Sequence, residues 1–252
     1  MAEVLVTGSA GAVGRPVCAE LVRRGHDVRG FDRRPCDGPH PTLVGDLLDR
    51  DAVRRAMRGI EVVIHLAAEP HDVDFTDLVG PNVLGLYHVM HAGREERVRR
   101  VVLASTIQVL SRRRGPGPAS VEDAAPGNHY ALTKVWAEQM GRMYSRRYGL
   151  SVLCVRIAWL VRDVGEARRM VELGKPRLYL SADDAGRFFA RAVEAECIDY
   201  AVVYAVSRGG EEVFDMEPAR RLLGYEAQDL WPSGLGFDLP PDLLAAPRSI
   251  GA

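Results

Sequence analysis

The sequence of 252 residues contains no apolar run near the roughly 20 residues that a membrane-spanning helix needs. It also has no strong charge of either sign, because 33 basic and 34 acidic residues leave a formal net charge of −1. Such a balance offers no attraction for nucleic acid or for an anionic membrane surface. With 47% hydrophobic and 27% charged residues, the composition is typical of a globular protein. We therefore expect neither a membrane nor a nucleic-acid-binding protein, but one that acts on a small molecule.

Cysteine and lysine are both scarce. The cysteines form no Cys-x-x-Cys pair and lie far apart, at Cys18, Cys36, Cys154 and Cys197. This spacing indicates reduced thiols in a cytoplasmic protein, with neither a metal site nor a disulfide framework. Because a strand pattern begins directly after the N-terminus, we also expect no signal peptide. Of the 33 basic residues only Lys134 and Lys175 are lysines, and a lysine in such a chain can indicate a position where a guanidinium would not serve.

A glycine-rich turn follows the first apolar run of the chain. Residues 4–6 have the length of a buried strand, and a helical pattern covers residues 13–24. Between them, Gly8 permits a tight turn, Gly11 lets the backbone approach a pyrophosphate, and Gly14 lets the helix pack closely on the strand. The helix N-terminus adds free N–H groups and a partial positive charge. An ordinary strand-to-helix turn can carry the same glycines, but the position after the first strand favours a dinucleotide site.

An acidic residue follows the next apolar segment. Residues 26–31 are predicted to form a second strand, and Asp32 comes directly after it, about 20 residues beyond the glycine turn. At that spacing a carboxylate accepts hydrogen bonds from both ribose hydroxyls of an adenosine and repels a 2′-phosphate, which favours NAD over NADP. Arg33 and Arg34 leave NADP open as the cofactor, because a guanidinium beside the ribose can bind that phosphate.

Strands and helices alternate along the chain. Further strands are predicted at 43–45, 62–66, 101–104, 151–156 and 201–206, and further helices at 49–58, 74–94 and 129–148. This alternation predicts an α/β fold, a Rossmann-type doubly wound parallel sheet, in a single domain over residues 1–252. A small C-terminal substrate lobe is expected mainly from residues 157–182 and 207–252. Ligands bind at the C-terminal ends of parallel strands, and that edge is expected to hold Gly8, Asp32, Asp46, Ala67 and Thr106.

Two further features lie near that edge. His65 stands within an apolar strand, so we interpret it as a packed core histidine. Residues 111–128 include a stretch rich in glycine and proline and are predicted to form a mobile loop, a candidate lid over the strand ends. The arginine triplet of this loop, at 112–114, either attracts an anionic substrate or forms a solvated face.

A tyrosine and a lysine lie one helical turn apart in the predicted helix 129–148. The i, i+4 spacing places the Tyr130 phenol and the Lys134 ammonium on one face. A free tyrosine, with a pKa of about 10, is a poor base at neutral pH, and a neighbouring ammonium, helped by an oxidised nicotinamide, is expected to lower that pKa. Tyr130 then takes the hydroxyl proton of an alcohol while hydride leaves for a nicotinamide. Thr106, at the end of the adjacent strand, is placed to hydrogen-bond the same oxygen.

Together these residues resemble the motifs of the extended short-chain dehydrogenase/reductase superfamily, over nearly the whole chain. The matching segments are Thr7-Gly8-Ser9-Ala10-Gly11-Ala12-Val13-Gly14, Asp32, Gly45-Asp46-Leu47, His65-Leu66-Ala67-Ala68, Asn82, Ser105-Thr106, Tyr130 with Lys134, Arg156 after the sixth strand, and Leu223-Gly224-Tyr225. The resemblance implies a Rossmann fold, a bound nicotinamide dinucleotide and a catalytic set of Thr106, Tyr130 and Lys134.

The resemblance also implies positions around the cofactor. Asp46 and Leu47 are expected beside the adenine, Ala67 is expected beside the nicotinamide ribose, and Lys134 is expected to bind that ribose. The other residues expected in the cofactor site are Ala10, Ala12, Val13, Arg33, Leu66, Ala68 and Asn82. Members of the superfamily tend to dimerise, which implies a homodimer through the helices predicted at 74–94 and 129–148.

Among members of the superfamily the chain is most similar to the uronate dehydrogenases, which oxidise a sugar acid at C1 to a lactone with NAD. The short length, residues 180–184 and the C-terminal region carry this likeness. The expected substrate pocket departs from that group, with Pro70 in place of a serine, Ile107 and Gln108 in place of an Asn-His pair, and Trp159 in place of another serine. Only Arg168 or Arg169 is left to hold a carboxylate. Loss of hydroxyl-binding groups favours a less polar substrate, unless Trp159 simply packs in the core.

The leading functional hypothesis is an NAD-dependent oxidoreductase that acts on an alcohol or carbonyl of a small sugar-like or secondary metabolite. One alternative is a sugar epimerase that retains its NAD. Another is a non-catalytic regulator that senses the dinucleotide, although the Tyr130 and Lys134 pair counts against it. Dehydration is disfavoured, because Ile107 and Gln108 stand where dehydratases of the superfamily carry acidic residues.

Overall fold

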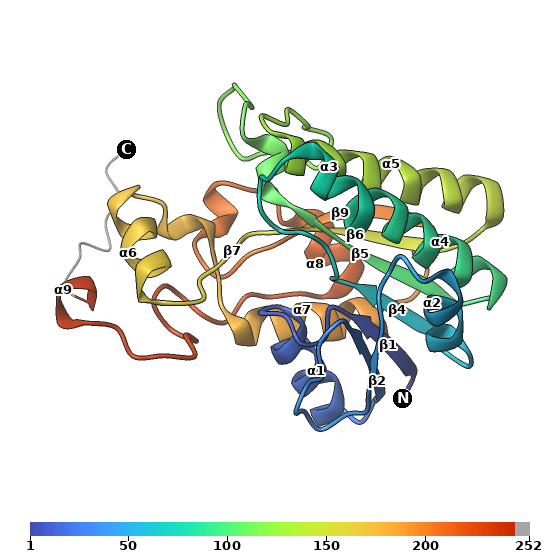
Figure 1. Cartoon of the computed structure of the whole chain (residues 1–252). Helices are drawn as coiled ribbons and strands as arrows, with labels where there is room; N and C mark the ends of the chain where they lie inside the picture. Colours follow the sequence, from blue (N-terminus) through green and yellow to red (C-terminus); the bar gives the residue numbers. More distant parts are fainter. Residues whose placement is uncertain (245–252) are drawn as a thin grey trace.

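One parallel sheet with helices on both faces organises the computed structural model, which describes residues 1–244 (Figure 1). The strands are β1 Glu3–Thr7, β2 Asp27–Asp32, β3 Thr42–Val44, β4 Val62–His65, β5 Arg100–Thr106, β6 Ser151–Ile157 and β9 Tyr200–Ala205. They follow the order β3-β2-β1-β4-β5-β6-β9, and every neighbouring pair is parallel. The order reverses at the boundary between β1 and β4, where such sheets bind ligands. The predicted Rossmann-type doubly wound fold is confirmed.

The helices form a layer on each face of this sheet. Their bounds are α1 Gly14–Arg23, α2 Arg50–Met57, α3 Phe75–Leu78, η1 Val79–Gly85, α4 Leu86–Glu95, η2 Ile107–Leu110, α5 His129–Tyr148, α6 Val164–Glu172, η3 Pro176–Leu178, α7 Ala182–Glu194, η4 Gly210–Glu212, α8 Glu217–Leu223 and α9 Pro241–Leu244. α1 and α7 pack together on one face, and α2, α4 and α5 cover the other (Figure 1). Within residues 1–244, no helix is both long and apolar enough to cross a bilayer.

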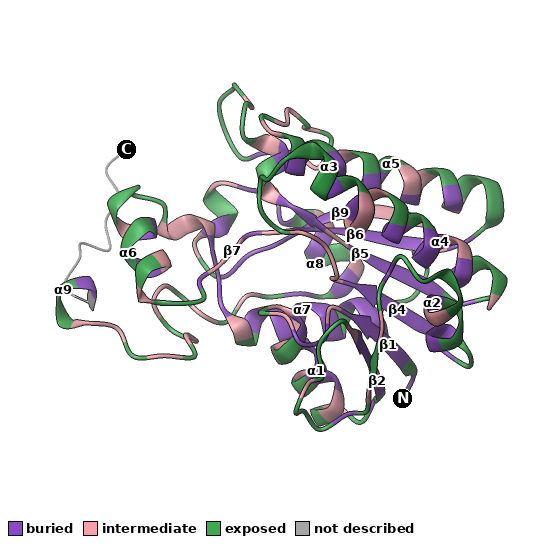
Figure 2. Cartoon of the chain, viewed as in Figure 1, coloured by how far each residue is buried: buried purple, intermediate pink, exposed green. Residues whose placement is uncertain are grey.

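The central strands are apolar along their length because helices cover both of their faces. In β4 the side chains of Val62, Val63 and Ile64 are completely buried, and Figure 2 shows the same burial across the middle of the sheet. β3, at one edge, is the most exposed strand of the sheet. Local signals set the ends of α5: the Asn128 side chain caps its N-terminus, and Gly149 ends it in the left-handed conformation. The predicted helix at 129–148 therefore matches α5.

The prediction of one continuous helix at 74–94 is wrong. The structure divides it into α3, the π-helical segment η1 and α4. Pro81 lies inside η1 and has no N–H to donate, so the ordinary helical hydrogen bonding is interrupted there. This interruption directs Asn82 into the protein, where it is buried.

The loop predicted as a mobile lid, residues 111–128, is instead attached to its surroundings. The Arg113 guanidinium pairs with Asp123 at 2.8 Å and also donates to carbonyl oxygens of the same loop. The carbonyl oxygen of Ser120 accepts from the Tyr204 hydroxyl, and Ala119 pairs with the backbone around Phe214. Arg113 therefore holds its own loop together and is not free to attract an anionic substrate.

A set of segments outside the main sheet packs around an apolar cluster of its own. The short strands β7 Trp159–Leu160 and β8 Tyr179–Leu180 pair with each other, and α6 and α9 lie beside them at the outer end of the molecule (Figure 1). Trp159 is half-buried and packs against this cluster, and its contact with substrate stays a prediction. Residues 245–252 of the expected lobe lie outside the described residues.

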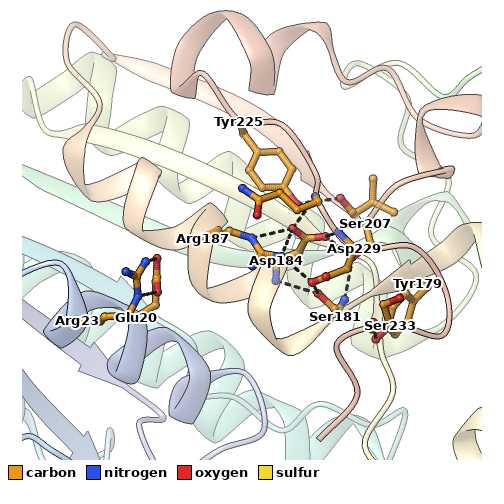
Figure 3. A network of polar contacts seen from close by, with 12 residues as sticks. Glu20, Arg23, Tyr179, Ser181, Asp184, Arg187, Ser207, Tyr225, Asp229 and Ser233 are labelled. Atoms are coloured by element: carbon orange, nitrogen blue, oxygen red, sulfur yellow. Dashed lines mark hydrogen bonds and ion pairs between the residues drawn. The ribbon is translucent and has the colours of Figure 1, made fainter.

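A buried carboxylate attaches the C-terminal segment to the sheet (Figure 3). Asp184, at the start of α7, is fully buried and accepts from the Ser207 hydroxyl, the Arg187 guanidinium and the N–H of Asp229. The Asp229 carboxylate in turn accepts from Arg187 at 2.6 Å and from the Ser181 hydroxyl. Because each buried oxygen has donors, the network places the segment around Asp229 beside the N-terminus of α7.

Candidate active site

The glycine turn between β1 and α1 has the conformation that a dinucleotide cradle needs. Gly8 has a φ of +74°, and a Cβ there would lie 2.7 Å from the N atom of Ala67. A Cβ on Gly14 would overlap the carbonyl oxygen of Gly8, so only glycine permits this close approach of helix and turn. In the described residues, the N–H groups of Ala12 and Val13 donate to no protein acceptor. Two free donors at the start of a helix suit a pyrophosphate.

Asp32 lies next to this cradle at the end of β2. Its carboxylate accepts from the N–H of Ala10 and from the N–H of Arg34, each at 3.0 Å. These bonds hold a half-exposed carboxylate at the place expected for the adenosine ribose. Arg33 and Arg34 are exposed beside it. The residues present therefore fit an adenine dinucleotide.

Replacing Gly14 by alanine tests the cradle. Because the new Cβ meets backbone and not a flexible side chain, the turn must shift, and we expect NAD to bind about tenfold more weakly or worse. Gly236→Ala is the matched control, since its Cβ would enter open space. Isothermal titration with NAD measures both variants. Wild-type affinity in Gly14→Ala would exclude this turn as the binding site.

The expected adenine and nicotinamide segments lie along the same edge of the sheet. Asp46 accepts from the N–H of Leu48 at 2.9 Å, and Leu47 is buried with its carbonyl oxygen 2.8 Å from the His88 ring. Ala67 donates its N–H to the Thr7 hydroxyl at 3.3 Å. Leu66 and Ala68 flank Ala67 after the end of β4, and both are half-buried.

Tyr130, Lys134 and Thr106 come together between α5 and the end of β5. All three are buried, and the Thr106 side chain acts on the Tyr130 phenol by favouring a lower pKa. The Lys134 Nζ lies 5.7 Å from the centroid of the Tyr130 ring and donates to the Ala104 carbonyl oxygen at 3.0 Å. The predicted i, i+4 geometry is present, and the bond to Ala104 ties the lysine to the neighbouring strand.

The lowering of the Tyr130 pKa that was expected from Lys134 together with an oxidised nicotinamide stays a prediction, and the protein alone shifts this pKa in the other direction. Burial raises the pKa of Tyr130 to about 12, although the hydrogen bond with Thr106 opposes that shift. Burial also lowers the pKa of Lys134 to about 8. His65, packed as predicted, is 2.8 Å from the Thr7 hydroxyl, and its pKa falls to about 3 through burial and, second, the charge of Lys134. A buried phenol without an added positive charge stays protonated.

Asn82 positions the loop after β4. Its amide oxygen accepts from the N–H of Glu69 at 2.8 Å, and its amide nitrogen donates to the Glu69 carbonyl oxygen at 3.1 Å. The same nitrogen donates to the Thr133 hydroxyl, which donates to the Tyr130 carbonyl oxygen. The bonds of Asn82 in the structure are thus to protein groups, and they connect the loop to the helix that carries Tyr130.

Sequence reasoning missed a buried ion pair beneath this group. Glu138 lies one helical turn beyond Lys134 and receives two hydrogen bonds of 2.9 Å from Arg156. Ser105 donates to the same carboxylate at 2.6 Å, and Arg156 also donates to the carbonyl oxygen of Asp123. Arg156 lies within β6, not after it, so it is a buried structural group. The i+4 spacing of Glu138 from Lys134 places both on one face of α5, and this is the signal that could have found Glu138 as a buried carboxylate.

The residues expected to contact substrate have different surroundings in the structure, and their role stays a prediction. Pro70 and Gln108 are exposed, with Gln108 accepting from the Asn128 amide at 3.1 Å, and Ile107 packs partly against the core. Arg168 pairs with Asp242 at 2.8 Å on the exposed side of α6, where Arg169 is also exposed. Trp159 lies in the outer apolar cluster. Sequence reasoning did not consider Glu69, whose charge contributes to the raised pKa of Tyr130 and whose carboxylate contacts the His71 ring at 2.8 Å.

Comparison with known proteins agrees with this geometry. The profile described as the NAD dependent epimerase/dehydratase family matches residues 4–170. The L-arabinose 1-dehydrogenase (NAD(P)(+)) of Haloferax volcanii is 31% identical, over 91% of this chain and 97% of its own. The uronate dehydrogenase of Pseudomonas syringae pv. tomato is 30% identical, over 81% of this chain and 74% of its own. A solved mutated uronate dehydrogenase superposes with a TM-score of 0.80 at 29% identity, covering 91% of this chain and 83% of that structure.

Proposed function

This chain belongs to the NAD dependent epimerase/dehydratase family, and on that premise we propose that it is an NAD-dependent dehydrogenase that oxidises a sugar at C1 to a lactone. The observation that carries the proposal is the contact of Tyr130 with Thr106 above Lys134, at the sheet edge that also holds the glycine cradle. The relatives support the substrate class, since those named above are dehydrogenases of sugars or sugar acids.

In the proposed reaction the Tyr130 Oη takes the proton of the C1 hydroxyl as the carbonyl forms. A bound NAD would supply the acceptor for the hydride of C1. The Thr106 Oγ1 donates a hydrogen bond to the same substrate oxygen and orients it. Lys134, with no carboxylate partner of its own in the described residues, stabilises the phenolate of Tyr130 and offers its Nζ to the ribose. Burial of the group excludes water from the proton transfer.

We propose NAD as the cofactor, with Asp32 as the residue that selects it. The carboxylate faces the expected ribose hydroxyls and repels a 2′-phosphate. The exposed Arg33 and Arg34 can bind the 2′-phosphate of NADP, which then serves as a weaker second cofactor.

A panel of aldoses and uronates, supplied with NAD, tests the function. We expect NADH to form in equal amount to the lactone. Interconversion of sugars without NADH would favour an epimerase that retains its NAD. Absence of any conversion across the panel, with NAD still bound, would favour a sensing role and would contradict the proposal.

We also propose that the outer segments around β7, β8 and α6 form the substrate lobe and that the protein works in the cytoplasm. The lobe is supported by its own apolar cluster beside the sheet edge. The cytoplasmic location is supported by four cysteines that are all unpaired.

A homodimer is proposed through α3, η1, α4 and α5. Large apolar side chains are exposed along these helices: Phe75, Val79, Leu84, Tyr87, Leu132, Trp136, Met143 and Tyr148. Exposed apolar side chains gathered on adjoining helices are typical of an interface, and a second copy of this chain presents the same helices.

Trp136→Glu tests the dimer. A charge placed among apolar side chains is expected to weaken association by at least about tenfold. Leu173→Glu is the matched control, because Leu173 is exposed at the end of α6, away from this surface. Sedimentation velocity over a dilution series separates the two outcomes. A monomeric wild type, or equal association of both variants, would contradict the proposed interface.

A further inference from the structure

We infer that Ser105 is a positioning residue, which through Glu138 holds helix α5, and with it Tyr130, at a set place against the end of β5. The inference rests on the proposed dehydrogenase function, because it concerns how the base and its partner hydroxyl meet the substrate oxygen. Ser105 directly precedes Thr106 in the strand, so any shift of the Ser105 backbone also moves Thr106.

The side chain of Ser105 lies on the face of the sheet that α5 covers. Helix α5 packs over β5 and β6 (Figure 1). Along β5, Leu103 belongs to the apolar cluster beneath α5, whereas Val102 belongs to the cluster on the opposite face. Because side chains alternate between the two faces of a strand, Ser105 shares the face of Leu103. Ser105 is thus the last residue of β5 on the side of this helix.

A carboxylate on α5 accepts a hydrogen bond from the Ser105 hydroxyl. The Ser105 Oγ donates to the Glu138 Oε1 at 2.6 Å, and both residues are only 3% exposed. Two hydrogen bonds of 2.9 Å from Arg156 on β6 fix the orientation of that carboxylate. A hydrogen bond to an ionised group is short and strong. The bond from Ser105 therefore defines where α5 lies relative to the strand.

A second polar contact, one helical turn nearer to the N-terminus of α5, acts together with the first. The Lys134 Nζ donates at 3.0 Å to the carbonyl oxygen of Ala104, the residue before Ser105. Two consecutive residues of the strand thus bind two residues on one face of the helix. Tyr130 lies one further turn along the same face. Sliding or rotation of α5 that moves Tyr130 must therefore disturb both contacts.

Loss of the Ser105 hydroxyl would weaken this attachment at a single point. The Lys134 bond and the ion pair of Glu138 would stay, so the fold is kept. The separation between the Tyr130 phenol and the Thr106 hydroxyl would become less restricted. A misplacement of about 1 Å in an active site can lower the rate about 10²-fold. Ser105 thus acts on the reaction through its neighbours, without contact with the substrate.

Ser105→Ala tests the inference by kinetics. We expect kcat for the sugar that the panel identifies to fall about tenfold or more, because the two oxygens at the reacting centre are less well placed. The KM for NAD should stay unchanged, since the glycine cradle is not altered. A loss confined to kcat separates positioning from a general loss of folded protein, which urea unfolding measures independently.

Ser151→Ala is the matched control. Ser151 begins β6, at the opposite end of the same pair of strands, and its hydroxyl also bonds a buried side chain, accepting from Arg100 at 2.9 Å. The control removes a comparable hydrogen bond away from Thr106 and should leave kcat unchanged. Unchanged kcat in Ser105→Ala, or equal falls in both variants, would overturn the inference while the dehydrogenase function stands.

A second measurement does not depend on any sugar. In crystal structures of the wild type and of Ser105→Ala, the separation of the Thr106 Oγ1 and the Tyr130 Oη should differ by about 0.5 Å or more, the tolerance of a catalytic arrangement. An unchanged separation would overturn the inference. Failure of every sugar to yield NADH would instead overturn the proposed function, and the two crystal structures would still decide whether Ser105 positions this pair.

Discussion

Replacing Tyr130 by phenylalanine is expected to lower turnover about 10²- to 10⁴-fold. The variant removes only the Oη that takes the proton, and the ring still fills its buried place below the loop that carries Glu69. NAD affinity should change little, because Gly8, Asp32 and the start of α1 are untouched. Steady-state NADH formation and NAD titration together measure the two effects.

Tyr144→Phe is the matched control for this variant. Tyr144 lies on the same helix and is also buried, but its ring packs at a tilt against that of Tyr148, away from the group around Thr106. Turnover in this control should equal that of the wild type. Full activity in Tyr130→Phe would remove the proposed base and with it the assigned mechanism.

The largest expected effect on stability comes from Glu138. Glu138→Gln leaves the buried Arg156 guanidinium without its counter-charge and should lower the free energy of unfolding by about 3–5 kcal/mol. Two bonds of 2.9 Å and nearly complete burial of both side chains distinguish this pair from surface pairs. Urea unfolding, followed by circular dichroism, gives the change in free energy.

Two controls isolate the charge. Glu226→Gln removes a carboxylate from an exposed pair with Arg220 and should leave the unfolding midpoint nearly unchanged. The double variant Glu138→Leu with Arg156→Met removes both charges and should lose less stability than Glu138→Gln. A double variant less stable than the single one would show that the hydrogen bonds of Arg156 to Asp123 and Tyr204, not its charge, carry the effect.

Features set by short stretches of chain were predictable from the sequence. The glycine turn depends on spacing within a few residues, and Tyr130 with Lys134 depends on one helical turn. The sheet followed from the alternation of apolar runs with helical patterns. Even the end of α5 at Gly149 has a local cause, the left-handed conformation that glycine accepts.

Features set by contacts between residues far apart in the chain could not be predicted from the sequence. Arg168 forms an ion pair with Asp242, which lies 74 residues later in the chain. The sequence around Arg168 therefore gave no sign that its guanidinium already has a partner. Glu69 acquires its place through Asn82 and Thr133 on two other helical segments. The pKa of Tyr130 in the protein alone depends on its burial by the whole fold, which the spacing of Tyr130 and Lys134 does not reveal.

The central claim is that a C1 hydride of a sugar is transferred by this site, and an isotope experiment tests it most directly. The sugar most rapidly oxidised in the panel is prepared with deuterium at C1 and incubated with the protein and NAD. Mass spectrometry of the nicotinamide product should show deuterium in the reduced cofactor, in equal amount to the lactone formed. Reduced cofactor without deuterium, or sugar conversion without reduced cofactor, would contradict the account.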